Sequence, residues 1–266
     1  MSNAIRCFLA MLIILFSIGN VAAMDFSSLY ESNTEINDED VYEQLEAMHK
    51  AQRLFVLMQD GGSDLYAVDA CNAYISDCIA KNLITWSDLG IKDGREYLVL
   101  ASDCRRLSVD NARQALEGGN IGDTKKLVYS ESISAWESED ADPLIRAKNL
   151  FQIMQRGPDY YTIVGYDSYI RNSVEEGAVT WSDLGLRDEI DYELVVCGCK
   201  RQSALNAWES LTNSNIGSPE EARVCCESIY AAIENGDLKE DDAPTWCTAG
   251  EIADRIIKNI AVEASV

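Results

Sequence analysis

The sequence predicts an all-α protein with two tandem four-helix repeats of about 95 residues and a C-terminal capping helix, of the α-solenoid or repeat-bundle kind. Three observations predict this class. The hexapeptide TWSDLG stands at residues 85–90 and again at residues 180–185. Apolar residues recur at steps of three, four or seven, which is the spacing of amphipathic helices. No stretch shows the sustained alternation with β-branched residues that indicates a strand.

An internal duplication extends well beyond the hexapeptide. A shift of 95 positions aligns residues 66–122 with residues 161–217, and 20 of these 57 positions are identical. With a gap of one residue the similarity continues on both sides. The sequence therefore predicts repeat 1 at residues 41–136 and repeat 2 at residues 137–232.

Each repeat contains four amphipathic segments in the same order. We expect the first three helices from the apolar spacing within residues 41–58, 68–79 and 97–116, and within 144–154, 163–174 and 192–211 of the second copy. The fourth helix is expected from Asp123 and from Ser218. In the second copy SPEE supplies a Ser N-cap, a Pro at the first helical position and Glu221 for a capping box.

The hexapeptide falls between the second and third helices of each repeat. Its Thr and Asp can cap a single helical turn, which its Gly can end in the left-handed conformation. We therefore interpret it as a structural repeat motif in which Trp packs under the turn and Asp faces the backbone. The residues concerned are Trp86, Asp88, Gly90, Trp181, Asp183 and Gly185. The alternative is a ligand pocket of Trp and Asp, used once per repeat.

The first 23 residues are typical of a signal peptide. Arg6 precedes the apolar run at residues 8–18, and Val21-Ala22-Ala23 places small residues at the cleavage site. A membrane span needs about 20 apolar residues, and this run is shorter. We expect a secreted or periplasmic protein with no transmembrane anchor after processing.

Two further segments flank the repeats. Residues 24–40 are expected to form a mobile N-terminal arm. Residues 233–266 are expected to form an acidic linker and a capping helix, with Thr248 and Glu251 at capping-box spacing. Such a helix would cover the end of the array.

The charge of the chain is strongly negative. Without Arg6, 21 basic residues stand against 45 acidic ones, a net charge of 21 − 45 = −24. This field repels phosphate backbones and anionic membranes, so no nucleic acid partner is expected. A protein with a basic surface is the expected partner, although the charge also serves solubility.

Eight cysteines remain after cleavage, and an exported protein permits disulfides. The candidate disulfide cysteines are Cys71, Cys78, Cys104, Cys197, Cys199, Cys225, Cys226 and Cys247. Most fall on apolar stripes, where reduced Cys packs as a small hydrophobic residue. Pairing of Cys71 or Cys78 with Cys104, or of Cys197 or Cys199 with Cys225 or Cys226, stays open.

The sequence predicts no metal site, cofactor or catalytic residue. No zinc-type cysteine spacing, EF-hand loop, nucleophile elbow or phosphate loop is present, and His49 is the sole histidine. Carboxylate pairs act without histidine, as in glycoside hydrolysis, but no pair stands out.

The predicted function is a secreted, acidic, non-enzymatic protein-interaction module, because repeat arrays present extended surfaces without a reaction centre. The hexapeptide and the phrase ENGDL at residues 234–238 resemble segments of helical-repeat proteins that host-associated bacteria export. This resemblance implies an interaction role and assigns no catalytic residue. The alternatives are a small-ligand carrier with an aromatic pocket between helices and a carboxylate-dependent hydrolase.

Overall fold

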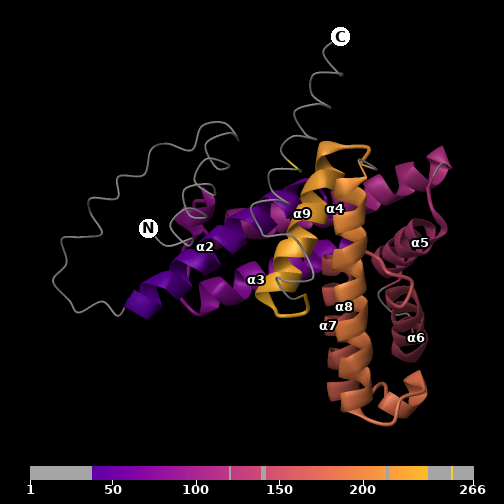
Figure 1. Cartoon of the computed structure of the whole chain (residues 1–266). Helices are drawn as coiled ribbons and strands as arrows, with labels where there is room; N and C mark the ends of the chain where they lie inside the picture. The colour runs from indigo at the N-terminus through magenta and orange to yellow at the C-terminus, as the bar shows by residue number, and fades with distance from the viewer. Residues whose placement is uncertain (1–37, 120, 139–141, 214–215, 239–252, 254–266) are drawn as a thin grey trace, which may run out of the picture. The chain divides into compact units, whose positions relative to one another are not determined.

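A computed structural model describes residues 38–119, 121–138, 142–213, 216–238 and 253 (Figure 1). These residues form helices and connecting turns and contain no strand, which confirms the all-α prediction. The chain divides into two compact units, Met1–Glu43 and Gln44–Val266. The described part of the first unit is the beginning of one helix, and every contact reported below lies within the second unit.

The helices follow one another in an order that occurs twice. The first series is α2 (Asp38–Gln59), α3 (Leu65–Ala80), the one-turn 3-10 helix η2 (Trp86–Leu89), α4 (Gly94–Gly118) and α5 (Asp123–Glu137). The second is α6 (Pro143–Met154), α7 (Tyr160–Glu175), the 3-10 helix η3 (Trp181–Leu184), α8 (Glu189–Thr212) and α9 (Pro219–Glu234). Each α-helix overlaps a segment where the sequence predicts a helix.

Side-chain caps explain where these helices begin. Asp64, Asp93, Asp159 and Asp188 precede α3, α4, α7 and α8, and each accepts hydrogen bonds from backbone N–H groups of the first turn. Ser218 caps α9 in the same way, with Pro219 at the first position. Such caps satisfy donors that have no partner inside the helix.

The helix α3 packs extensively on α7, and α8 on α9 (Figure 1). Tyr66 of α3 is buried in the core formed mainly by α6, α7 and α8. Tyr161 of α7, which aligns with Tyr66, is buried in the core formed mainly by α2, α3 and α4. Each of the two helices thus places a tyrosine in the core of the other series, and each core depends on that side chain.

Ion pairs connect α2 to α9 beside these cores. Arg53 lies 3.0 Å from both Glu227 and Glu234, and Lys50 lies 2.9 Å from Glu234. Because these groups are largely removed from water, the pairing compensates for the cost of burying their charges.

The helix α2 begins at Asp38, within the arm expected at residues 24–40, since acidic residues favour a helix N-terminus. After α9 ends at Glu234, Asn235 and Gly236 are exposed and Leu238 is buried. The signal peptide, the rest of the arm and the predicted capping helix lie outside the described residues, apart from the helical, buried Ala253.

Within the described ranges, no helix has both the length and the apolar character needed to cross a membrane.

Candidate interaction site

The two hexapeptides form one-turn 3-10 helices with the same local geometry. We call the turn at η2 the first corner and the turn at η3 the second corner. In η2 the Asp88 carboxylate accepts the N–H of Thr85 at 2.7 Å, and Gly90 ends the turn in the left-handed region with φ of 70°. In η3 the Asp183 carboxylate accepts the N–H of Thr180 at 2.9 Å, and Gly185 has φ of 80°. Both Asp side chains are therefore occupied by the capping of one turn.

Each corner places its tryptophan against a tyrosine of the following long helix. The rings of Trp86 and Tyr97 have centroids 4.8 Å apart, and those of Trp181 and Tyr192 lie 4.7 Å apart. Both tyrosines are buried, whereas both tryptophans are half-buried. Each indole therefore packs on one face and leaves part of its surface to solvent.

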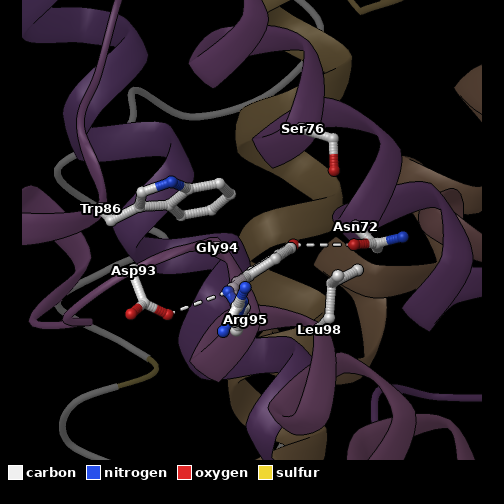
Figure 2. Close-up of a pocket in the computed structure, with 8 residues that line it drawn as sticks. Asn72, Ser76, Trp86, Asp93, Gly94, Arg95 and Leu98 are labelled. Atoms are coloured by element: carbon white, nitrogen blue, oxygen red, sulfur yellow. Dashed lines mark hydrogen bonds between the residues drawn. The ribbon is translucent and has the colours of Figure 1, made fainter.

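The first corner contains a solvent-open pocket of about 530 Å³ (Figure 2). Its lining comes from α3, η2 and the start of α4 and consists of Asn72, Ser76, Trp86, Asp93, Gly94, Arg95, Tyr97 and Leu98. The hydroxyl of Tyr97 donates to Oδ1 of Asn72 at 2.8 Å. Burial raises the pKa of Tyr97, so the phenol stays neutral and donates this hydrogen bond.

The lining contains two charged residues, Asp93 and Arg95. Asp93 accepts the backbone N–H groups of Arg95 and Glu96 at 2.9 and 3.0 Å, so its carboxylate is occupied by the cap of α4. Leu98 of the lining is 69% exposed, and the next residue of α4, Val99, is 63% exposed. Large aliphatic side chains exposed together mark contact surfaces more often than isolated ones do.

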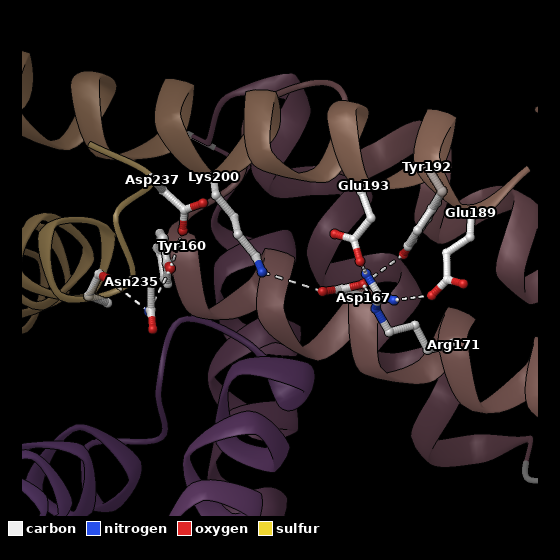
Figure 3. A network of polar contacts seen from close by, with 10 residues as sticks. Tyr160, Asp167, Arg171, Glu189, Tyr192, Glu193, Lys200, Asn235 and Asp237 are labelled. Atoms are coloured by element: carbon white, nitrogen blue, oxygen red, sulfur yellow. Dashed lines mark hydrogen bonds and ion pairs between the residues drawn. The ribbon is translucent and has the colours of Figure 1, made fainter. Parts of the chain in front are cut away.

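The second corner holds an arginine where the first has a pocket (Figure 3). Arg171 of α7 donates to Asp167 at 2.7 Å, to Glu189 at 3.2 Å and to Glu193 at 2.7 Å. Its guanidinium also lies over the ring of Tyr192, 5.3 Å from the centroid. Burial opposes the charge, but Asp167 and Glu193 together raise the pKa of Arg171.

The two corners differ at four positions that a shift of 95 residues aligns. Asn72 corresponds to Asp167, Ser76 to Arg171, Gly94 to Glu189 and Leu98 to Glu193. The second corner thus has three carboxylates where the first has neutral residues, and a cation that they bind in place of Ser76. Sequence analysis assigned none of these residues to a site, although their joint replacement around an unchanged Trp and Tyr was a signal that could have found it.

The lining of the first pocket contains one carboxylate, that of Asp93. Carboxylate-based glycoside hydrolysis uses two acidic groups, and this pocket has one, which already caps a helix. Across the described residues no group of three or more His, Cys, Asp or Glu side chains could hold a metal ion. His49 lies outside the lining, and burial followed by the charge of Arg53 lowers its pKa.

The cysteines lie mainly in the core. No disulfide joins any two of the seven cysteines at described positions, and Cys247 lies outside them. Cys71, Cys78, Cys104 and Cys226 are buried, Cys199 and Cys225 are half-buried, and Cys197 is exposed on α8. Burial raises the pKa of Cys71, as it does for Cys104, so these thiols are held in the unreactive protonated form.

No protein-family model, no curated protein and no solved structure matches this chain.

Proposed function

We propose that this protein is a secreted, non-enzymatic interaction module that receives a side chain of a partner protein in the pocket beside Trp86. The observation that carries the proposal is the contrast between the two corners. The second corner is filled by the chain's own Arg171, whereas the first leaves the corresponding space open. A corner that served only to turn the chain would not need this difference.

The proposed architecture is a tandem pair of units at residues 41–136 and 137–232. Three features support it: the helix order that occurs twice, the equal caps of η2 and η3, and the aligned Trp–Tyr pairs. After duplication, one corner could retain a purely structural role while the other acquired a binding role.

The chemistry of the pocket favours an apolar or aromatic side chain as its occupant. A guanidinium at the second corner has three carboxylate partners, and the aligned positions of the first corner offer Asn72, Gly94 and Leu98 instead. The indole face and the exposed Leu98 offer apolar contact to an incoming side chain. The net charge of −23 favours basic residues around that side chain on the partner.

The two alternative functions have less support. A small-ligand carrier encloses most of its ligand, whereas this pocket is open to solvent. A carboxylate-dependent hydrolase needs acidic groups with raised pKa values in a cleft, and the pocket lining contains no such pair.

The test converts the first corner into the second. The triple variant Asn72→Asp, Ser76→Arg, Leu98→Glu introduces the guanidinium with two of its carboxylate partners and preserves an acceptor for the Tyr97 hydroxyl. Peptides are selected from a random display library on residues 24–266 of the unmodified protein. We expect the selected peptides to carry an aromatic or long aliphatic residue flanked by Lys or Arg.

The triple variant should bind these peptides at least about tenfold more weakly, a loss of roughly 1.4 kcal/mol. The matched control is Leu194→Glu, which introduces the same charge at a 70% exposed position of α8 outside the pocket. Circular dichroism checks that both variants keep their helices. Equal affinity of a peptide for the triple variant and the unmodified protein would show that the pocket is not the binding site.

A further inference from the structure

A carboxyl group is buried where α3 meets α7. Asp64, the N-cap of α3, is 1% exposed, and its carboxyl group accepts the backbone N–H of Ala67 at 2.7 Å. The hydroxyl of Thr162 on α7 lies 3.0 Å from the same Oδ1 atom. The hydroxyl of Ser132 on α5 donates to the Oδ2 atom at 3.3 Å. One carboxyl group therefore connects three helices.

The same threonine hydroxyl also contacts a second carboxyl group. Oγ1 of Thr162 lies 2.5 Å from Oδ2 of Asp159, the N-cap of α7. A hydroxyl has one proton, so it can donate to Asp64 or to Asp159 but not to both. If both carboxyl groups were ionised, one of these contacts would join two acceptors. A second proton, carried by one of the two carboxyl groups, would make both contacts hydrogen bonds.

No described cation pairs with Asp64. On α5, Glu131 lies 3.8 Å from Arg146 of α6, and Lys125 lies 3.0 Å from Glu221 of α9, so both cations are engaged elsewhere. The other titratable groups that face Asp64 are neutral or anionic: Asp159 and Tyr166 on α7, Tyr66 and Cys71 on α3, and Tyr129 on α5. A buried carboxylate without a cation is costly, and protonation removes that cost.

We infer that Asp64, Thr162 and Asp159 form a proton-binding junction, which takes up one proton when the chain folds and holds α3 and α7 together more firmly once protonated. The inference depends on these contacts alone and is independent of the proposed function. In agreement, burial and then the charge of Asp159 raise the pKa of Asp64 to about 7, against the opposing hydrogen bonds from Ala67, Thr162 and Ser132.

The direction of the pH dependence follows from this raised pKa. The folded protein holds a proton on Asp64 up to about pH 7, whereas the unfolded chain releases it near the ordinary value of 3.8. Folding is therefore accompanied by proton uptake between these values, and stability falls as the pH rises through this window. The contribution is fully present below about pH 4 and is lost above pH 7.

The first test is thermal unfolding of residues 24–266 between pH 5 and pH 8. Asp64→Asn mimics the protonated form and does not titrate, so it should be more stable than the unmodified protein at pH 8. We expect Tm of the unmodified protein to fall by roughly 5–10 °C relative to this variant over the range. The matched control is Asp188→Asn, the exposed N-cap of α8, which should keep the full pH dependence.

The second test separates proton binding from a purely structural role. Asp159→Asn removes the negative charge beside Asp64, so the midpoint of the pH dependence should move to lower pH by roughly half a unit or more. In the unmodified protein, the infrared carbonyl band of a protonated carboxylic acid should grow as the pH falls from 8 to 6 and should be absent from Asp64→Asn. A parallel pH dependence of Tm in Asp64→Asn, or no such band in the unmodified protein, would overturn the inference.

Discussion

Gly165 of α7 lies directly against the backbone of Tyr66 in α3. A β-carbon at position 165 would stand 2.3 Å from the carbonyl oxygen of Tyr66 and 2.7 Å from its carbonyl carbon. Only glycine permits this approach, because backbone atoms have no rotamer into which they could move away. The contact fixes how closely α3 and α7 pack.

Gly165→Ala should therefore destabilise the protein, although alanine is the better helix former. We expect a loss of about 3 kcal/mol in the free energy of unfolding, since the two helices must separate to admit the methyl group. Urea denaturation measures it. The matched control is Gly198→Ala in α8, where a β-carbon meets no atom within 4 Å. That change should stabilise by roughly 0.5–1 kcal/mol, and equal effects at the two positions would contradict the close approach.

Arg171→Ser should destabilise the second corner by about 1–3 kcal/mol, because it leaves Asp167 and Glu193 without their main cation. Lys200, which lies 3.4 Å from Asp167, compensates in part. The double variant Arg171→Ser, Asp167→Asn gives the second corner the serine and asparagine that the first corner has as Ser76 and Asn72. It should recover most of the loss in a double-mutant cycle, and strictly additive losses would show that the two side chains are not coupled.

Trp86→Ala and Trp181→Ala test what the hexapeptide contributes to stability. Each indole packs against a buried tyrosine but remains half-exposed. We therefore expect each variant to lose about 1–3 kcal/mol, less than the 3–5 kcal/mol typical of a fully buried aromatic residue. Thermal unfolding of both variants measures this. Unchanged midpoints would mean that the tryptophans serve contacts outside the fold.

Association with a basic partner should be faster at low salt. The net charge of −23 attracts cationic surfaces, and salt screens this attraction beyond about 10 Å at 0.1 M ionic strength. Stopped-flow association rates for a selected peptide should fall as the salt concentration rises, while the dissociation rates change little. Association rates that stay flat over the same series would remove the electrostatic part of the proposal.

Processing of the signal peptide predicts a mature chain that starts at Met24. Arg6 and Cys7 should then be missing from the exported protein. Intact-mass spectrometry of the protein recovered from the culture medium or the periplasm measures this directly. A mass that still includes residues 1–23 would contradict export by cleavage.

Local features could be predicted from the sequence. The helices α3 and α7 follow from apolar spacing, and the corner turns follow from the Thr, Asp and Gly of the hexapeptide, because caps and turns act over a few residues. The pocket beside Trp86 was not predicted. Its lining residues come from α3 and α4, which a turn separates in the chain. Whether the space between them is open or filled depends on the size and charge of one side chain, which is Ser76 in the first corner and Arg171 in the second.

The sequence by itself determined that this protein is helical, which segments form its helices, and that one hexapeptide shapes two corners, since each property is set by residues close together in the chain. Only the tertiary structure decided that Tyr66 and Tyr161 each lie in the core of the other helix series and that Asp64 is buried beside Asp159. These outcomes depend on which face of α3 meets which face of α7, nearly a hundred residues apart in the chain. Apolar spacing shows that a helix has a buried face, but it does not say which helix covers that face.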